Sequence, residues 1–280
     1  MDRRSIRVKT QEIMLEAIKK GGINMITAPD LERAMGITVA FTGRNGGTSK
    51  PPFEQLNLAY DVGDERKAVT SNRLLLGKEL SVSPDDWVVG RQVHGSCVKR
   101  VGELERGRGG VDTWSAIPRS DGVVTESQGI ALCILTADCL PLVLVCGPSR
   151  VVGVAHVGWR GALYRVTESA IVKLLEYAGC RKEEITAFLG PCIGPCCLKV
   201  GQEVADEFRR FIGDEAVIRG DDGSMRLDLA SLCRRQLVEA GIESKNIFSA
   251  EVCTRCDEGY FSYRGSGGNT GRQAGIVALR

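Results

Sequence analysis

Histidine is scarce in this sequence, with only two residues among 280. A protein with several copper centres would need many imidazoles, because imidazole is the ligand that best suits copper in proteins. Two histidines cannot supply them, so the composition excludes that class. A single blue-copper centre, built from two histidines, one cysteine and a weak axial ligand, stays compatible with the composition. We favour zinc, because a reduced intracellular site with Lewis-acid chemistry suits zinc better.

The sequence also lacks a strong charge of either sign and an apolar segment at its start. The net charge is +2, and the arginines are dispersed among acidic residues. Composition therefore gives no reason to expect binding to nucleic acid or to a membrane. Cysteine, in contrast, is frequent, with eleven residues. Because no signal segment precedes them, we expect a cytoplasmic protein with reduced thiols.

No internal repeat, low-complexity run or linker divides the chain. Apolar periodicity predicts helices near residues 64–80, 162–178, 199–212 and 228–240. It predicts strands at residues 36–42, 121–125, 130–136, 142–146, 151–156, 185–190, 246–252 and 274–279, and paired strands within 87–101. These strands are too often consecutive for a regular βαβ repeat. We therefore predict an α+β fold, with mixed β-sheets packed with helices in a layered sandwich, in a single domain.

Residues 9–20 carry apolar side chains at helical spacing before Gly21 and Gly22. This pattern predicts a short amphipathic helix that ends at the glycine pair. We assign residues 1–34 to an N-terminal extension and residues 35–280 to the catalytic domain.

The two histidines lie in glycine-flanked segments that end strand-like runs, and Cys139 follows an apolar strand between them. Two imidazoles and a thiolate suit one catalytic zinc, which keeps a fourth position open for water or substrate. Cys139 follows His94 by 45 residues and precedes His156 by 17, which matches no short metal motif. Spacing alone therefore slightly favours ordinary strand-end residues over a metal site.

Six sequence blocks resemble the laccase-domain family, whose older name is multicopper polyphenol oxidase. They occur in family order from about residue 37 onward, and three of them contain His94, Cys139 and His156. The blocks read Phe41-Thr42-Gly43-Arg44-Asn45-Gly46-Gly47-Thr48-Ser49, Gln92-Val93-His94-Gly95, Thr136-Ala137-Asp138-Cys139-Leu140-Pro141, His156-Val157-Gly158-Trp159-Arg160-Gly161, Leu189-Gly190-Pro191-Cys192-Ile193-Gly194, and a C-terminal stretch with Phe261-Ser262-Tyr263-Arg264 and Thr270-Gly271-Arg272-Gln273-Ala274.

The resemblance implies a purine nucleoside phosphorylase that splits adenosine, inosine and 5′-methylthioadenosine with phosphate and also deaminates adenosine. His94, Cys139 and His156 match the family's zinc ligands. Inorganic phosphate would be the co-substrate, in a monomer or homodimer. Bacterial relatives are also described as a peptidoglycan editing factor, a cytosolic amidase for wrongly built UDP-sugar amino-acid precursors. The motifs do not separate these two activities.

Other chemical interpretations of the same residues stay open. Cys139 could act as a thiolate nucleophile with a histidine base, which would support the amidase activity. Tight zinc binding would weaken that model, because one thiolate cannot serve both purposes. A copper-dependent polyphenol oxidase and a non-catalytic zinc-stabilised nucleotide-binding module are the least favoured alternatives.

Phosphorolysis requires a phosphate dianion to be held beside the anomeric carbon of the ribose. We predict Arg44 as its principal anchor and as a catalytic residue beside the three zinc ligands, because a glycine-rich loop adds backbone amides to the guanidinium. Asn45 lies in the same loop. Arg264 and Arg272 are further candidates that the sequence does not rank. Trp159 could pack under a ribose or base, or in the core.

Two features of the sequence leave roles unassigned. Zinc deaminases of the cytidine type carry an H-x-E motif, whose glutamate transfers the proton. Neither histidine here begins such a motif, so deamination would need another proton carrier. Asp138, beside Cys139, could be that carrier, or it could be a hydrogen-bonding residue that orients a ligand. The second feature is a set of cysteines whose spacing allows a four-thiolate zinc site. We favour packing or cavity-lining roles for them over a second zinc or a disulfide; the set comprises Cys192, Cys196, Cys197, Cys253 and Cys256.

Overall fold

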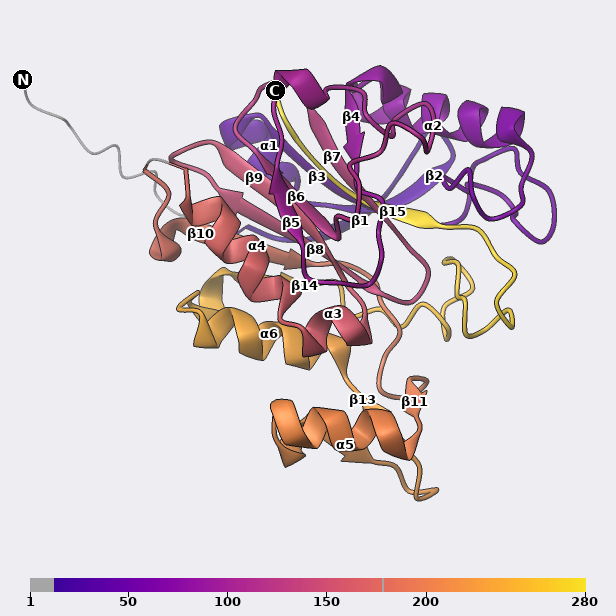
Figure 1. The fold of residues 1–280 in the computed structure, drawn as a ribbon. Coiled ribbons are helices and arrows are strands. Elements are labelled where there is room, and N and C mark those ends of the chain that lie inside the picture. The colour runs from indigo at the N-terminus through magenta and orange to yellow at the C-terminus, as the bar shows by residue number, and fades with distance from the viewer. Residues whose placement is uncertain (1–12, 178) are drawn as a thin grey trace, which may run out of the picture.

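The computed structural model describes residues 13–177 and 179–280, and two six-stranded sheets form the centre of this part of the chain (Figure 1). The first sheet has the order β1 (Glu16–Lys20), β2 (Ile23–Thr27), β3 (Ile37–Thr42), β15 (Gln273–Leu279), β7 (Ala131–Thr136) and β4 (Trp87–Val89). The second has the order β14 (Ile247–Ser249), β10 (Ile185–Leu189), β8 (Leu140–Cys146), β9 (Val151–Val157), β6 (Gly122–Thr125) and β5 (Val98–Arg100). Both sheets mix parallel and antiparallel pairs.

Helix α2 (Arg66–Leu80) covers the outer face of the first sheet, and α4 (Val166–Leu175) and α6 (Leu229–Glu239) cover the outer face of the second. The other helices are α1 (Pro29–Met35), α3 (Trp159–Leu163) and α5 (Gln202–Phe211). A small third sheet, formed by β11 (Lys199–Val200), β13 (Met225–Leu227) and β12 (Val217–Arg219), lies with α5 at the lower end of the molecule in Figure 1. No described helix has the length and apolar character needed to cross a bilayer.

Alternation of side chains along the strands builds three apolar layers. On β8, Leu142 and Leu144 face the core beneath α4 and α6, whereas Val143 and Val145 face the core between the two sheets. On β7, Leu132 points into that inter-sheet core, and the other face of the strand packs toward α2. The result is a helix–sheet–sheet–helix sandwich, which confirms the predicted layered α+β fold in one domain.

The helix predicted over residues 9–20 is wrong from Glu16 onward, and residues 1–12 lie outside the described part of the chain. Strand β1 pairs in antiparallel register with β2, and Lys20 faces Ile23 across a two-residue turn. Gly21 and Gly22 both have positive φ, at 57° and 86°. Such a turn matches the twist of a β-hairpin and requires residues that tolerate positive φ. The glycine pair therefore closes a hairpin that extends the first sheet.

The predicted strand pairing within residues 87–101 is also wrong. Strand β4 belongs to the first sheet, where it pairs with β7, and β5 belongs to the second, where it pairs with β6. The segment between β4 and β5 therefore crosses from one sheet to the other. The remaining predicted strands and the helix over residues 64–80 are confirmed within a few residues.

Gly275 allows the two sheets to approach closely. A Cβ atom at this position would lie 2.7 Å from Cβ of Pro141 on the facing sheet and 3.4 Å from the Phe41 ring. Overpacking of this kind costs about 1–3 kcal/mol. We expect Gly275→Ala to lower the free energy of unfolding by that amount in urea denaturation.

Gly102→Ala is the matched control for this prediction. Its φ of −148° suits alanine, and the nearest atom to its added Cβ would be Ser127 Oγ, at 3.7 Å. We expect a change within about 0.5 kcal/mol for this control. Equal unfolding midpoints for both variants would show that the sheets can separate at Gly275 without cost.

Candidate metal site and cavity

Two crossings of the chain between the sheets bring His94, Cys139 and His156 together. His94 lies on the segment that leaves β4 and enters β5, and Cys139 lies in the turn between β7 and β8. His156 is on β9, directly opposite Pro141 of β8. Each residue ends a strand or follows one, so the site forms where both sheets end.

One ring nitrogen of each histidine and the Cys139 sulfur all lie within 4.8 Å of one another. The two imidazole rings are 4.8 Å apart between centroids and meet edge to face at 77°. Gly158 leaves room for the group, since a Cβ there would lie 3.0 Å from Cys139 Sγ and 3.2 Å from His94 Cδ2. The geometry supports a metal-binding group that spacing alone did not favour.

Asp121 is the residue that sequence reasoning missed. Its side chain is fully buried and its Oδ1 lies 3.0 Å from Nδ1 of His156. The same carboxylate accepts backbone N–H bonds from Val93, His94 and Gly95, the last two at 2.8 Å. Burial opposes ionisation, but these bonds hold the pKa of Asp121 below its usual range. Asp121 therefore fixes the orientation of His156 and the backbone of the His94 turn.

The Cys139 thiol and the His156 ring perturb each other strongly. Burial alone would raise the pKa of Cys139, but the His156 and His94 rings lower it to about 6. Burial alone would lower the pKa of His156, but the Cys139 thiolate and Asp121 raise it to about 9. Without a metal the pair is therefore a thiolate and an imidazolium at neutral pH.

The donor set fits a single metal ion. Two imidazoles and one thiolate are the ligands of a catalytic zinc site with one open position. A carboxylate on the other ring nitrogen of a ligating histidine is the usual outer support of such a site. His156 can ligate through Nε2 while Nδ1–H donates to Asp121, and the residues present thus meet both requirements.

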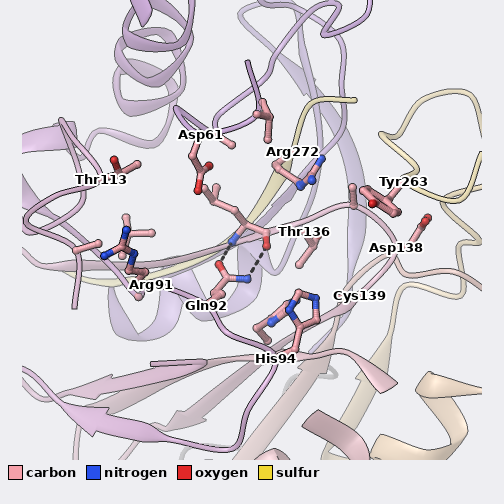
Figure 2. Close-up of a pocket in the computed structure, with 18 of the residues that line it drawn as sticks. Asp61, Arg91, Gln92, His94, Thr113, Thr136, Asp138, Cys139, Tyr263 and Arg272 are labelled. Atoms are coloured by element: carbon pink, nitrogen blue, oxygen red, sulfur yellow. Dashed lines mark hydrogen bonds between the residues drawn. The ribbon is translucent and has the colours of Figure 1, made fainter. Parts of the chain in front are cut away.

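The group opens into a cavity of about 650 Å³, within the usual range for small-molecule sites. Figure 2 shows His94 and Cys139 near one another, with Arg272, Asp61 and Tyr263 around the same space. Gln92 is fixed in the cavity lining, because its side-chain amide makes two hydrogen bonds of 2.8 Å with the backbone of Leu135. The polar lining residues include Asp61, Arg73, Arg91, Gln92, Asp112, Thr113, Thr136, Asp138, Trp159, Arg160, Tyr263, Arg264 and Arg272.

Of the predicted phosphate-binding residues, Trp159, Arg264 and Arg272 line this cavity. The Arg264 guanidinium donates to the Lys199 carbonyl oxygen at 2.9 Å. Arg272 donates through Nη1 alone to two carbonyl oxygens of its own loop, and burial lowers its pKa from the usual value. Among the described residues, the other guanidinium nitrogens of Arg272 donate to no protein group, so they can bind an anion.

The structure does not bring Arg44 and Asn45 to the cavity lining. Arg44 Nε donates to the Glu54 carbonyl oxygen at 2.7 Å, and its guanidinium lies over the Phe261 ring at 4.8 Å. Its Nη2 also pairs with the Glu54 carboxylate at 3.3 Å. These contacts hold the Arg44 side chain against its own loop, and its role as a phosphate anchor stays a prediction.

Asp138 holds the turn that carries Cys139. Its Oδ1 accepts a bond from Thr254 Oγ1 at 2.8 Å, and its Oδ2 accepts the Arg264 backbone N–H at 2.7 Å. Its carbonyl oxygen accepts the Ile193 N–H at 2.8 Å. Its φ of 89° is unfavourable for a side chain with a Cβ, so these bonds stabilise a strained turn. Of the two roles considered, the contacts favour hydrogen bonding over proton transfer.

Several cavity residues had no signal in the sequence beyond their residue type. Arg91 precedes the His94 block and Arg160 lies within the His156 block, yet nothing in their spacing indicates that they share one cavity. Arg73 is buried on α2 and donates to the carbonyl oxygens of Leu58, Gly109 and Gly110. For Asp121, the available signal was a polar residue at the start of an apolar strand, which is also common at ordinary strand ends.

The fold and the site define a layered α+β protein with a His-Cys-His metal-binding group in a cavity where the two sheets end. The family model described as multi-copper polyphenol oxidoreductase laccase matches residues 38–280. The chain belongs to this family, which confirms the resemblance identified from its motifs.

Curated relatives cover most of the chain. A protein of Geobacillus stearothermophilus named purine nucleoside phosphorylase YlmD is 34% identical over 249 residues, which are 88% of this chain and 91% of the relative. Adenosine deaminase RL5, from an unknown prokaryotic organism, is 34% identical over 85% of this chain and 92% of its own. The crystal structure of G. stearothermophilus YlmD superimposes with a TM-score of 0.87 at 33% identity, covering 96% of this chain and 99% of that one.

We expect Asp121→Asn to weaken metal binding about 10–100-fold, because the amide cannot replace the carboxylate that orients His156. Competition with a chromophoric chelator measures this affinity. Asp228→Asn is the control: Asp228 caps α6 by accepting the Ser231 N–H, and it does not line the cavity. An unchanged affinity for Asp121→Asn would show that His156 needs no such support.

In metal-depleted protein, alkylation of Cys139 is expected to be half-maximal near pH 6, since the thiolate is the reactive form. An ordinary thiol would reach that point near pH 8.5. Peptide mapping after iodoacetamide pulses across the pH range measures the profile. His156→Ala should move the midpoint upward, because His156 is the main group that lowers the pKa. If the wild-type protein reached half-maximal alkylation only at about pH 8 or above, as an ordinary thiol does, the result would contradict the ion pair.

Proposed function

We propose that this protein is a purine nucleoside phosphorylase of broad specificity, with adenosine deamination as a side activity. It would convert adenosine, inosine and 5′-methylthioadenosine with phosphate to the free base and a ribose 1-phosphate or its methylthio analogue. The observation that carries the proposal is a single cavity that holds the His-Cys-His group together with several arginines. The names of the relatives at 34% identity support the same chemistry.

We propose zinc as the metal, bound by His94, Cys139 and His156. When bound, it would supply Lewis-acid polarisation of a phosphate or nucleoside oxygen, or of a water for deamination. Asp121 keeps the Nδ1 proton on His156, which leaves Nε2 free to ligate. Metal ligation by Cys139 would also disfavour its use as a free nucleophile, on which the amidase interpretation depends.

Phosphate is the attacking group in phosphorolysis. Its oxygen forms a bond to the anomeric carbon while the bond from that carbon to the purine nitrogen breaks, and the purine leaves with the bonding electrons and takes up a proton. The cavity must therefore hold a dianion beside a developing cationic ribose. Arg91, Arg160 and Arg272 line the cavity and are the proposed phosphate ligands. Within the described chain, Arg91 and Arg160 are exposed and donate no side-chain hydrogen bond to a protein group.

Trp159 and Tyr263 offer aromatic surfaces for the nucleoside in the same cavity. Arg160 stacks on Trp159 at 4.3 Å, and Arg272 lies 5.7 Å from the Tyr263 ring centroid. Each aromatic ring is therefore paired with a proposed phosphate ligand.

The test is whether adenosine and inosine yield free base only when phosphate is present. We expect phosphate-dependent base release from the wild type, and a loss of more than about 100-fold in Cys139→Ala and His94→Ala, because loss of an outer support alone costs 10–100-fold. Chromatography of the released bases at equal protein concentration measures both, and the zinc content of each protein is measured in parallel. Deamination is followed in the same assay as the conversion of adenosine to inosine.

Cys97→Ala provides the matched control, since Cys97 is an exposed free cysteine outside the cavity lining. It should retain wild-type base release. Absence of base release at any phosphate concentration would contradict the proposal. Hydrolysis of a peptidoglycan precursor amide by the same protein would then favour the amidase.

A further inference from the structure

Four cysteines outside the active-site cavity converge at the junction of two loops. Cys196 and Cys197 lie on the loop that follows β10, and Cys253 and Cys256 lie on the segment that follows β14. The sulfur of Cys196 is 3.5 Å from that of Cys253 and 3.7 Å from that of Cys256, while Cys197 and Cys256 are 3.4 Å apart. All four sulfurs lie within 4.8 Å of one another.

These separations match a four-thiolate metal site. A tetrahedral zinc with bonds of about 2.3 Å places its sulfur ligands about 3.8 Å apart. A disulfide would require about 2.05 Å, and all four cysteines are free thiols. One ion at the centre of the group would therefore need only small shifts of the side chains.

Ordinary core packing does not explain the group. Cys196 and Cys256 are exposed, whereas Cys197 is buried and Cys253 is intermediate. Exposed thiols gain little from burying apolar surface, so their convergence from opposite loops has no packing cause. The roles favoured from the sequence, packing or cavity lining, therefore do not fit Cys196 and Cys256.

Cys192 is not part of the group. Its buried side chain belongs to the apolar core beneath the second sheet, and burial raises the pKa of its thiol. Its backbone instead pairs with the facing loop, through the Cys192 N–H to the Val252 oxygen and the Thr254 N–H to the Cys192 oxygen. This bridge fixes the register at which the four other cysteines meet.

Both cysteine pairs lie on tight turns that place their sulfur atoms close to those of the other pair. The Cys197 N–H donates to the Gly194 oxygen at 2.9 Å, and the Cys256 N–H donates to the Cys253 oxygen at 3.1 Å. The Gly194 N–H donates to Cys253 Sγ at 3.2 Å, a bond that favours a thiolate. A Cβ at Gly194 would lie only 3.3 Å from Cys196 Sγ, so glycine keeps this approach open.

We propose that Cys196, Cys197, Cys253 and Cys256 bind a second, structural zinc ion in a closed four-thiolate site. Zinc is the ion chosen because four thiolates in a tetrahedron with no open position are its usual structural site. The site lies outside the cavity lining, and the proposal does not rest on the proposed catalytic function.

Its effect on the active site would pass through Asp138. The two loops that the zinc joins also carry Ile193 and Thr254, which hydrogen-bond to Asp138 beside Cys139. Arg264, farther along the second loop, donates its backbone N–H to the same side chain. The second zinc would thus hold in place the wall of the cavity that carries a catalytic metal ligand.

The test is the zinc content of purified protein, measured by mass spectrometry and X-ray absorption. We expect two zinc ions per chain in the wild type and one in Cys139→Ala, and that remaining ion should have sulfur neighbours only. Cys256→Ser should lose one zinc ion and melt at a lower temperature than wild type. Cys256 is exposed, so the change of side chain alone should cost little stability, and the lower melting temperature would come from the lost zinc ion. Cys97→Ser, an exposed cysteine outside the group, should keep both ions and the wild-type melting temperature.

A Cys139→Ala protein without zinc, or with iron in its place, would overturn the proposal. Disulfides among the four cysteines in freshly reduced protein would overturn it as well. The spectrum of Cys139→Ala depends only on the second site and does not require that Cys256→Ser folds. This measurement does not depend on nucleoside turnover, so it still tests the second zinc site if the catalytic proposal fails.

Discussion

The buried carboxylate of Asp121 is the interaction on which the site depends. It is fully buried, and a carboxylate at such a depth is tolerated only when its oxygens are well supplied with donors. Three consecutive backbone N–H groups at residues 93–95 and the His156 ring meet that need. The backbone of Asp121 adds a bond from its N–H to the Cys97 oxygen and accepts one from the His156 N–H. One residue therefore fixes both histidines, one through its turn and the other through its ring.

Sheet topology explains why the metal group forms at this place. A chain that crosses from one packed sheet to another must do so at an end of the sandwich, where loops are accessible. The β4–β5 and β7–β8 connections both cross there, and they carry His94 and Cys139. The positive φ values of His94 and Asp138, at 59° and 89°, belong to these crossings. Strain at such positions is characteristic of functional sites that the surrounding structure holds firmly.

The active-site cavity and the four-cysteine group share one wall. Asp138 receives hydrogen bonds from both loops that the cysteines join, and it precedes Cys139 directly. A metal ion between those loops would limit their separation, much as a cross-link does. Because a catalytic geometry must be held within a fraction of an ångström, such a restraint gives the cysteines a role without contact with substrate.

The sequence by itself determined the layered α+β class and most strand positions, and its motif blocks predicted the three metal ligands. Strand periodicity and the motif blocks are local, so they could be identified without coordinates. Tertiary structure decided which strands pair, because pairing of β4 and β5 depends on distant partners in two different sheets. It also decided that Arg44 braces Glu54 while Arg91 and Arg160 reach the cavity, and that Asp121 supports His156. These contacts join residues far apart along the chain, and their geometry exists only once the two sheets have packed.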